Sequence, residues 1–194
     1  DLYHTAEHPD STTAAKETIQ MVTEQNERLS KLVRTLLDMS ELQTVSRNDR
    51  IELHSLIEEV LTDLEPLAQE KKVELIQKSQ EAGTKADEEL FLPGSDILIY
   101  RMLYNLVENA IKYNRENGSV TVSAIRKKNE VVLTVSDTGN GIDEAFREQI
   151  FEPFFRIDKS RSRELGGVGL GLAMVREVVR VHDGTIAVYA NKHK

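Results

Sequence analysis

The sequence predicts an α/β sandwich, in which helices cover one face of a mixed, largely antiparallel sheet, preceded by a long bundle-forming helix. Two observations lead to this fold class. Apolar residues repeat by heptads over residues 14–43, and after about residue 47 segments of helical and of strand periodicity follow one another. Because 194 residues are long for one domain and short for two, we expect a partial helical region over residues 1–46 and a full domain over residues 47–194.

The composition limits the class of protein. With 39% hydrophobic residues the chain can bury a core, and no run approaches the roughly 20 apolar residues of a membrane span. The lack of cysteine excludes a disulfide scaffold and thiolate metal sites. A net charge of −8 argues against a general nucleic-acid surface, which needs clustered Lys and Arg. Any anionic ligand must therefore be held by local groups.

The first segment carries a seam of apolar residues. Its two heptad core positions are occupied by Ile19, Val33, Val22, Leu29 and Leu36. A long surface helix folded onto its own domain is one explanation of such a stripe. Further apolar residues widen the stripe beyond a two-stranded coil, namely Leu32, Leu37 and Met39. We therefore favour a four-helix bundle completed by partner helices.

The elements of the second region follow from changes of period. Strands are predicted over residues 50–53, 72–76, 119–125, 130–136 and 184–189, and helices over residues 55–69, 95–113 and 169–182. The two alternating segments around "RKKN" are typical of a β-hairpin. Helices mixed with such strands favour the sandwich named above.

The helix predicted over residues 95–113 carries polar side chains beside its apolar stripe. At about 100° per residue, Asn105, Asn109 and Lys112 fall within an arc of roughly 60°. An amide oxygen can ligate Mg²⁺, which prefers oxygen, and an ammonium can contact phosphate. A structural alternative stays open, in which Glu108 and Lys112 form an i,i+4 ion pair and the asparagines cap or bridge locally.

The stretch "VSDTGNGI" places Asp137 at the end of a strand, followed by Gly139 and Gly141. A carboxylate in this position can be a simple turn former or Asx cap. A buried carboxylate can also accept a hydrogen bond from the amino group of adenine, while it repels the carbonyl oxygen of guanine. Glycines beside it let the backbone lie against the ring.

Glycines 166, 167, 169 and 171 in "GGVGLGLAM" stand directly before a predicted helix. Glycine within a helix costs roughly 1 kcal/mol relative to alanine, so this run requires an explanation. Backbone N–H groups at a helix N-terminus bind anions, and glycines let them approach phosphate oxygens. The stretch is not a P-loop, because Leu170 and Leu172 stand where lysine and a hydroxyl would follow the glycines.

The stretches "NLVENAIKYN", "DTGNGI", "FEPFFRID" and "GGVGLGLAM", in this order, resemble the N, G1, F and G2 boxes of sensor histidine kinases. "ERLSKLVRTLLDMSELQ" is similar to the second helix of that family's dimerisation and phosphoacceptor hairpin. The resemblance implies the Bergerat (GHKL) ATP-binding sandwich shared with gyrase, Hsp90 and MutL, with ATP and Mg²⁺ as cofactors. It also implies γ-phosphate transfer to a histidine, a response regulator as partner, a homodimer formed through the helical bundle, and the cytoplasmic portion of a membrane-anchored protein.

Carried over by position, the resemblance implies an ATP-binding set of Asn105, Asn109, Lys112, Tyr113, Asp137, Gly139, Gly141, Phe155, Arg156, Gly167, Gly169, Leu170 and Gly171. In this set Asn109 is the Mg²⁺ ligand and Lys112 a phosphate contact. Tyr113 lies against the adenine that Asp137 reads, and the glycines of the last motif contact phosphate. Phe154 and Phe155 resemble the hydrophobic anchor of a lid whose mobile part is residues 156–163.

The sequence departs from the family pattern in three places. The phosphoacceptor motif, a histidine followed by an acidic residue and then Thr-Pro, is absent, and we interpret His182 in "VHDGTI" as structural. Val168 stands where Ser or Thr is common, which removes one hydroxyl contact to phosphate. "YANKHK" stops where the family continues into a final strand, which predicts an incomplete sheet edge.

These departures leave three functions open. The main hypothesis is the ATP-binding core of a sensor histidine kinase, with no catalytic phosphoacceptor among these residues. One alternative is a nucleotide-binding and dimerising module without turnover. The other is a gyrase- or Hsp90-like ATPase, which hydrolyses ATP instead of transferring its phosphate.

Overall fold

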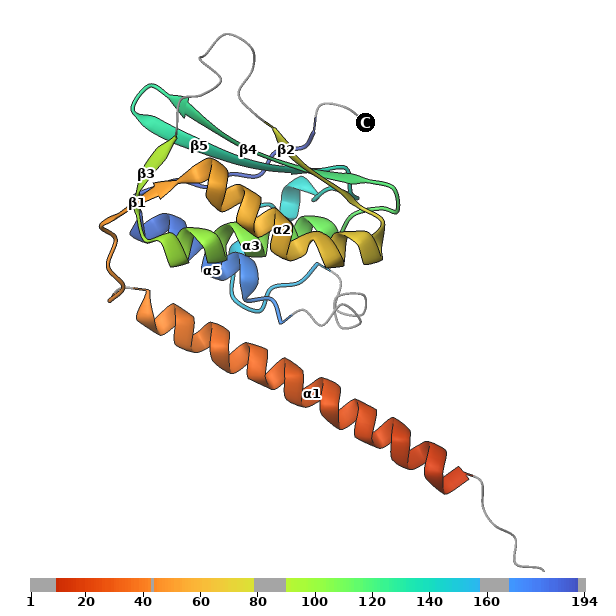
Figure 1. Ribbon diagram of the computed structural model, residues 1–194. Helices are drawn as coiled ribbons and strands as arrows, with labels where there is room; N and C mark the ends of the chain where they lie inside the picture. The colour runs from red at the N-terminus through yellow and green to blue at the C-terminus, as the bar shows by residue number, and fades with distance from the viewer. Residues whose placement is uncertain (1–9, 43, 79–89, 158–167, 192–194) are drawn as a thin grey trace, which may run out of the picture.

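The computed structural model describes residues 10–42, 44–78, 90–157 and 168–191 (Figure 1). In chain order its elements are α1 (Asp10–Glu41), β1 (Asp49–Glu52), α2 (Leu53–Lys71), β2 (Glu74–Lys78), β3 (Phe91–Gly94), α3 (Asp96–Lys112), β4 (Ser119–Lys127), β5 (Glu130–Asp137), the 3₁₀ turns η1 (Glu144–Phe146) and η2 (Gln149–Phe151), and α5 (Gly171–Val181). Within these ranges no helix has both the length and the apolar character needed to span a membrane.

The sheet is mixed, as predicted. Strands are ordered β2-β4-β5, with β2 parallel and β5 antiparallel to β4, while β1 and β3 form a separate antiparallel pair. Figure 1 shows α2 and α3 side by side across one face of the three-stranded sheet, with α5 beyond them. The domain after α1 is therefore a sandwich of helices on a sheet.

The hydrophobic core lies between this sheet and the helices. Side chains of α2, α3 and β4 meet there, among them Ile57, Val60, Leu103, Val107 and Val122, all almost completely buried. Fully burying one such side chain contributes about 1.5–3 kcal/mol. The core fixes the angular position of α3, and with it the direction of the polar residues on the rest of that helix.

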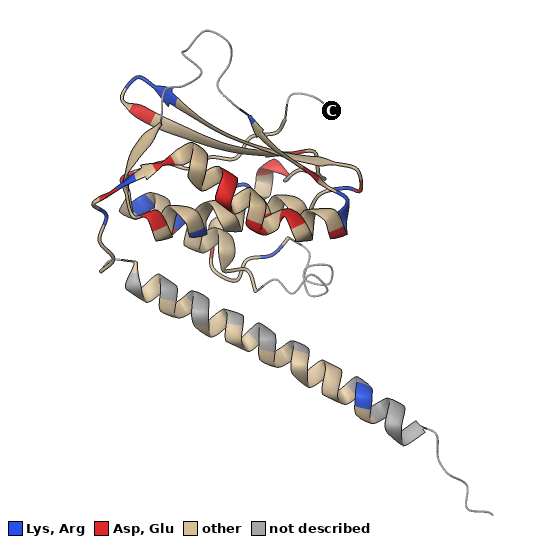
Figure 2. Cartoon of the chain, viewed as in Figure 1, with Lys and Arg blue, Asp and Glu red and all other residues tan. Residues whose placement is uncertain are grey.

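Local hydrogen bonds set the ends of α2. The Glu52 carboxylate accepts the backbone N–H groups of His54 (3.2 Å) and Ser55 (2.7 Å) and so caps the first turn. Burial by itself raises the pKa of Glu52, but these hydrogen bonds outweigh it and hold the pKa below its ordinary value. At the other end Lys72 adopts the left-handed conformation, with φ of 54°. Acidic residues predominate along the exposed side of α2 (Figure 2).

The predicted β-hairpin is confirmed. β4 and β5 pair from Lys127 opposite Glu130, so the turn consists of Lys128 and Asn129. Lys128 has a φ of 58°, which the two-residue turns that match the twist of a hairpin require.

One predicted strand is wrong, and one strand of the structure was not predicted. Residues 184–189 form no strand; instead the Asn191 side chain accepts a hydrogen bond from Ser136 Oγ (3.1 Å) and donates one to the Asp137 carbonyl (2.5 Å). The segment is thus held beside β5 by a side chain and not by a backbone ladder. Conversely, β3 was not predicted, because it has only four residues and contains Pro93, which cannot donate a ladder hydrogen bond.

α1 extends away from the domain, and its predicted apolar seam is exposed along most of its length (Figure 1). At its end the chain returns to the domain, where Leu42 is buried in the core and Met39 and Val45 pack against it. The prediction that partner helices cover the seam, and the division of the chain near residue 47, stay predictions.

Candidate nucleotide-binding site

The start of α5 lies directly against the asparagines of α3. Asn105 Nδ2 donates to the Arg101 carbonyl (2.8 Å), which leaves Asn105 Oδ1 facing α5. A Cβ placed on Gly171 would lie 2.8 Å from that oxygen and 3.8 Å from Asn109 Nδ2. Any larger residue would require the Asn105 side chain to shift. The structure therefore brings together the predicted residues Asn105, Asn109 and Gly171, which come from two separate motifs.

Lys112 lies one turn further along α3 and forms the ion pair that the structural alternative predicted. Its Nζ is 2.7 Å from Glu108 Oε1, and the two side chains are only 17% and 15% exposed. Burial, with the charges of Glu108 and Asp63, also raises the pKa of the neighbouring Tyr104. A phosphate that contacts Lys112 must therefore share its ammonium group with a carboxylate.

Asp137 ends β5 and turns the chain toward the end of α3. Its Oδ1 accepts the Gly139 N–H (2.8 Å), so the predicted Asx turn is present. Among the residues described, Oδ2 accepts no hydrogen bond, and this second oxygen is available to a ligand. A Cβ on Gly139 would lie 2.7 Å from the Tyr113 carbonyl, which places the turn in contact with the end of α3. Gly141 follows with a φ of 72°.

Position 169 requires glycine because the backbone of the preceding phenylalanine motif lies against it. Gly169 has a φ of 81°, and a Cβ there would lie 3.0 Å from the backbone of Phe154. The Phe154 N–H donates to the Gly169 carbonyl (2.8 Å). The two motifs are thus joined backbone to backbone, a contact that the sequence did not predict.

Only one of the two predicted anchor residues packs inward. The Phe155 ring is half-buried and 6.0 Å from the Phe146 ring, centroid to centroid. Phe154 is 57% exposed, and its φ of 65° places it outside the conformations that bulky residues favour; its role as an anchor of the lid stays a prediction.

The remaining residues of the predicted set have different positions. The Leu170 side chain is buried, and this residue stands directly before the first residue of α5. Arg156 is half-buried. Gly167 and residues 158–163 of the basic run lie outside the described residues. The contacts of all these residues with ATP stay predictions.

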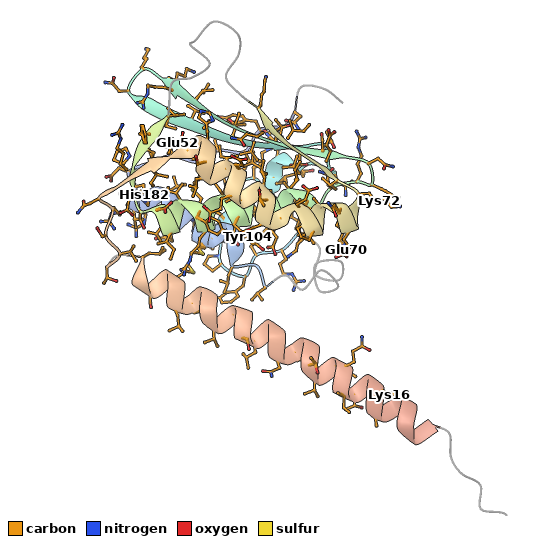
Figure 3. All side chains as sticks on the ribbon, viewed as in Figure 1. Lys16, Glu52, Glu70, Lys72, Tyr104 and His182 are labelled. Carbon is orange, nitrogen blue, oxygen red and sulfur yellow. The ribbon has the colours of Figure 1, made fainter. Side chains whose placement is uncertain are left out.

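His182 is structural, as interpreted from the sequence. Its Nδ1 donates to the Val178 carbonyl (2.8 Å), and its Nε2 accepts the Ser95 N–H (3.0 Å). A Cβ on Gly94 would lie 2.8 Å from the ring. Figure 3 shows His182 at the end of the domain where β1 and β3 lie. Because both ring nitrogens are used, neither is available to accept a phosphoryl group.

Sequence reasoning missed two residues of this region, Asn114 and Thr138. Each directly follows a residue of the predicted set, Tyr113 and Asp137 respectively, and the structure joins their side chains by a hydrogen bond. Position next to a motif was the available signal, but only the fold reveals that the two residues meet.

The chain is similar to known proteins of one family. The family described as histidine kinase-, DNA gyrase B-, and HSP90-like ATPase matches residues 94–194. The sensor-like histidine kinase SenX3 of Mycobacterium tuberculosis is 34% identical over 184 residues, which are 93% of this chain and 43% of SenX3. The chain spans less than half the length of the curated relatives it matches.

Solved structures of histidine kinases are also similar to this chain. The catalytic domain of the histidine kinase ThkA is 26% identical with a TM-score of 0.62, over 74% of this chain and 88% of that one. Full-length ShkA in complex with AMPPNP is 25% identical with a TM-score of 0.67, over 98% of this chain and 37% of ShkA. ThkA in complex with the response regulator protein TrrA, at 24% identity and a TM-score of 0.69 over 96% and 49%, adds a likeness of fold. The predicted fold and the resemblance to sensor histidine kinases are confirmed.

Proposed function

Since the chain belongs to the histidine kinase-, DNA gyrase B-, and HSP90-like ATPase family, we propose that it binds Mg²⁺-ATP along α3, as the catalytic part of a sensor histidine kinase. The supporting observation is that two glycine-containing motifs contact the polar face of α3, one near each end of that face. Gly171 of the glycine motif lies against Asn105, and Gly139 beside Asp137 lies against Tyr113. Along the helix axis these two contacts are about 12 Å apart.

The order of groups along α3 assigns a direction to the nucleotide. The base lies at the Tyr113 end, where Asp137 Oδ2 accepts a hydrogen bond from the amino group of adenine. The phosphates lie toward Asn105, where the first turn of α5 offers backbone N–H groups and the positive end of its dipole. Lys112 directly precedes Tyr113, and its long side chain supplies its ammonium group to the phosphate chain.

The α3 amides fit a magnesium ion that arrives with the nucleotide. Mg²⁺ is usually held by one or two protein oxygens together with substrate phosphates and water. Asn105 Oδ1 faces the start of α5, and Asn109 is on the same side of α3, as its approach to Gly171 indicates. We assign Asn109 as the ligand, with Asn105 nearby. When bound, the ion neutralises phosphate charge.

The reaction that this arrangement serves is transfer of the γ-phosphoryl group from ATP to a histidine nitrogen on a bundle helix, which leaves ADP. Phosphoryl transfer asks a protein chiefly for positioning and charge neutralisation, which are the tasks assigned here to α3, Asp137 and α5. The exposed seam of α1 supports a homodimer through a helical bundle. The ThkA–TrrA complex supports a response regulator as the further partner.

Labelled ATP tests this function. The chain is incubated with γ-labelled ATP and Mg²⁺, alone and with a separate polypeptide that carries the first hairpin helix of a sensor histidine kinase. We expect acid-labile, base-stable phosphate on the histidine of the added helix and none on the chain itself. Asn109→Ala should suppress this transfer and the Mg²⁺-dependent part of ATP binding, while adenosine still binds.

Each other outcome contradicts part of the proposal. Phosphate released without an acceptor indicates an ATPase, and ATP binding without transfer or release indicates a binding module. Label on His4, His8 or His182 would show that a phosphoacceptor lies within these residues. Equal losses of ATP and adenosine binding in Asn109→Ala would place the residue in the fold or the adenine pocket instead.

A further inference from the structure

A small network of hydrogen bonds joins three segments at the Tyr113 end of α3. Thr138 Oγ1 accepts the Ser119 N–H (2.8 Å) and donates to Asn114 Oδ1 (3.2 Å). Asn114 Nδ2 donates to the Ser119 carbonyl (3.0 Å), which also accepts the Thr138 N–H (3.1 Å). The second residue after α3, the first residue of β4 and the residue after β5 are therefore linked in a closed ring of contacts.

Two glycines allow these three segments to pack closely, because a side chain at either position would collide with a neighbouring segment. A Cβ on Gly118 would lie 2.7 Å from Thr138 Oγ1, and would also collide with Asn114 Oδ1. A Cβ on Gly139 would lie 2.7 Å from the Tyr113 carbonyl and 3.2 Å from Asn114 Cα. The network thus sets the distance between the end of α3 and the turn that carries Asp137.

The bond between Asp137 and Gly139 does not set that distance. It orients the carboxylate within its own turn, because both partners belong to the same short segment. The position of the turn relative to Tyr113 depends on contacts that cross between segments. Asn191 bonds to the Asp137 carbonyl from the segment after α5. Of the side chains described, Asn114 and Thr138 are the ones whose hydrogen bonds join this turn to the end of α3 that carries Tyr113.

We propose that Asn114 and Thr138 are positioning residues for base recognition, which hold the free Asp137 oxygen at a fixed place beside Tyr113. The inference rests on the proposed ATP-binding function and adds the residues that make it selective for adenine. Neither side chain has to touch the nucleotide. Their loss should therefore weaken selection of the base and leave the binding of phosphate, at the Asn105 end of α3, almost unchanged.

The test first compares three single variants at threonine positions and then adds Asn114→Ala and the double variant. Thr138→Val removes the hydroxyl with little change in shape, Thr138→Ser retains it, and Thr134→Val makes the same change at an exposed position of β5 away from the network. For each protein, calorimetry gives the dissociation constants for ATP, GTP and inorganic tripolyphosphate, and thermal unfolding gives Tm.

Thr138→Val should weaken ATP binding by about three- to tenfold, the usual net effect of losing one or two hydrogen bonds. Affinity for GTP and for tripolyphosphate should stay within about twofold, so that the ratio of ATP to GTP affinity falls by the same factor. Thr138→Ser should restore the ratio, and Thr134→Val should not change it. Asn114→Ala should lower the ratio too, and the double variant should lose less than the sum of the two, since both remove the same bond.

Two results would overturn the inference. An unchanged ATP-to-GTP ratio in Thr138→Val would show that the network does not act on base recognition. A parallel loss for all three ligands, with a lowered Tm, would show that it only stabilises the fold. A native chain that binds neither ATP nor tripolyphosphate would instead reject the proposed function itself.

Discussion

α1 and α3 both carry an apolar stripe at helical spacing, but the stripe of α3 is buried and that of α1 is exposed. On α3 the stripe is covered by α2, α5 and the sheet, and Leu103 is only 1% exposed. On α1 the stripe faces outward, and Leu29 is 59% exposed. Periodicity therefore determines which face of a helix is apolar, whereas it does not determine whether the same chain supplies the cover.

The difference separates the two roles of the chain. The covered stripe of α3 holds a rigid platform on which Asn105, Asn109 and Lys112 are presented. The uncovered stripe of α1 exposes several large apolar side chains on one face and is suited to association. The predictions below test whether nucleotide binding depends on α3 and its domain and is independent of α1.

The largest expected effect is on stability. Leu103→Ala should lower the free energy of unfolding by about 2–5 kcal/mol, because it opens a cavity among fully buried side chains. Leu29→Ala, the same change on the exposed stripe, should cost no more than about 0.5 kcal/mol in dilute solution. Urea denaturation of both variants measures the two values. Equal losses would show that the α1 stripe is covered by its own domain in solution.

A smaller effect is expected at the base end of α3. Asp137→Asn should weaken ATP binding by about ten- to a hundredfold, because a charged hydrogen bond contributes about 1.5–3 kcal/mol. Asp143→Asn is a matched control, since its carboxylate also caps a turn, through the Ala145 N–H (2.9 Å), but lies outside the proposed site. Calorimetry on both proteins distinguishes them, and a folded Asp137→Asn variant with native affinity would remove Asp137 from the site.

The smallest effect on ATP binding is expected from α1. Leu29→Asp places a charge on the exposed seam, and it should leave the ATP dissociation constant within about twofold while it lowers self-association. Analytical ultracentrifugation and calorimetry together test this. A large loss of ATP affinity would show that α1 contributes to the nucleotide site. Association and nucleotide binding would then not be divided between α1 and α3.

The sequence predicted the parts of the site that follow from local spacing. Asn105, Asn109 and Lys112 share a side of α3 because the angle per residue is fixed, and Asp137 ends a strand as its alternating pattern indicated. The pairing of β4 with β5 also followed from local pattern, as the hairpin needed only two turn residues.

Contacts between distant segments could not be predicted in this way. The positive φ of Gly169 is explained by the backbone of Phe154, and the bond between Asn114 and Thr138 forms only after β4 and β5 have paired beside α3. The prediction of a strand over residues 184–189 was wrong for a related reason. Its alternating residues fit a ladder, but in the fold a single asparagine side chain provides the attachment to β5.

The histidine near the end of α5 has a mechanical consequence. His182 bonds to its own helix through Val178 and to the residue before α3 through Ser95, at the end of α5 opposite to Gly171. α5 cannot slide along α3 without breaking the second of these bonds and leaving the buried Ser95 N–H unpaired. The bond therefore holds the end of α5 to the residue that precedes α3, so that the two helices are tied together at the end of the domain opposite to Gly171.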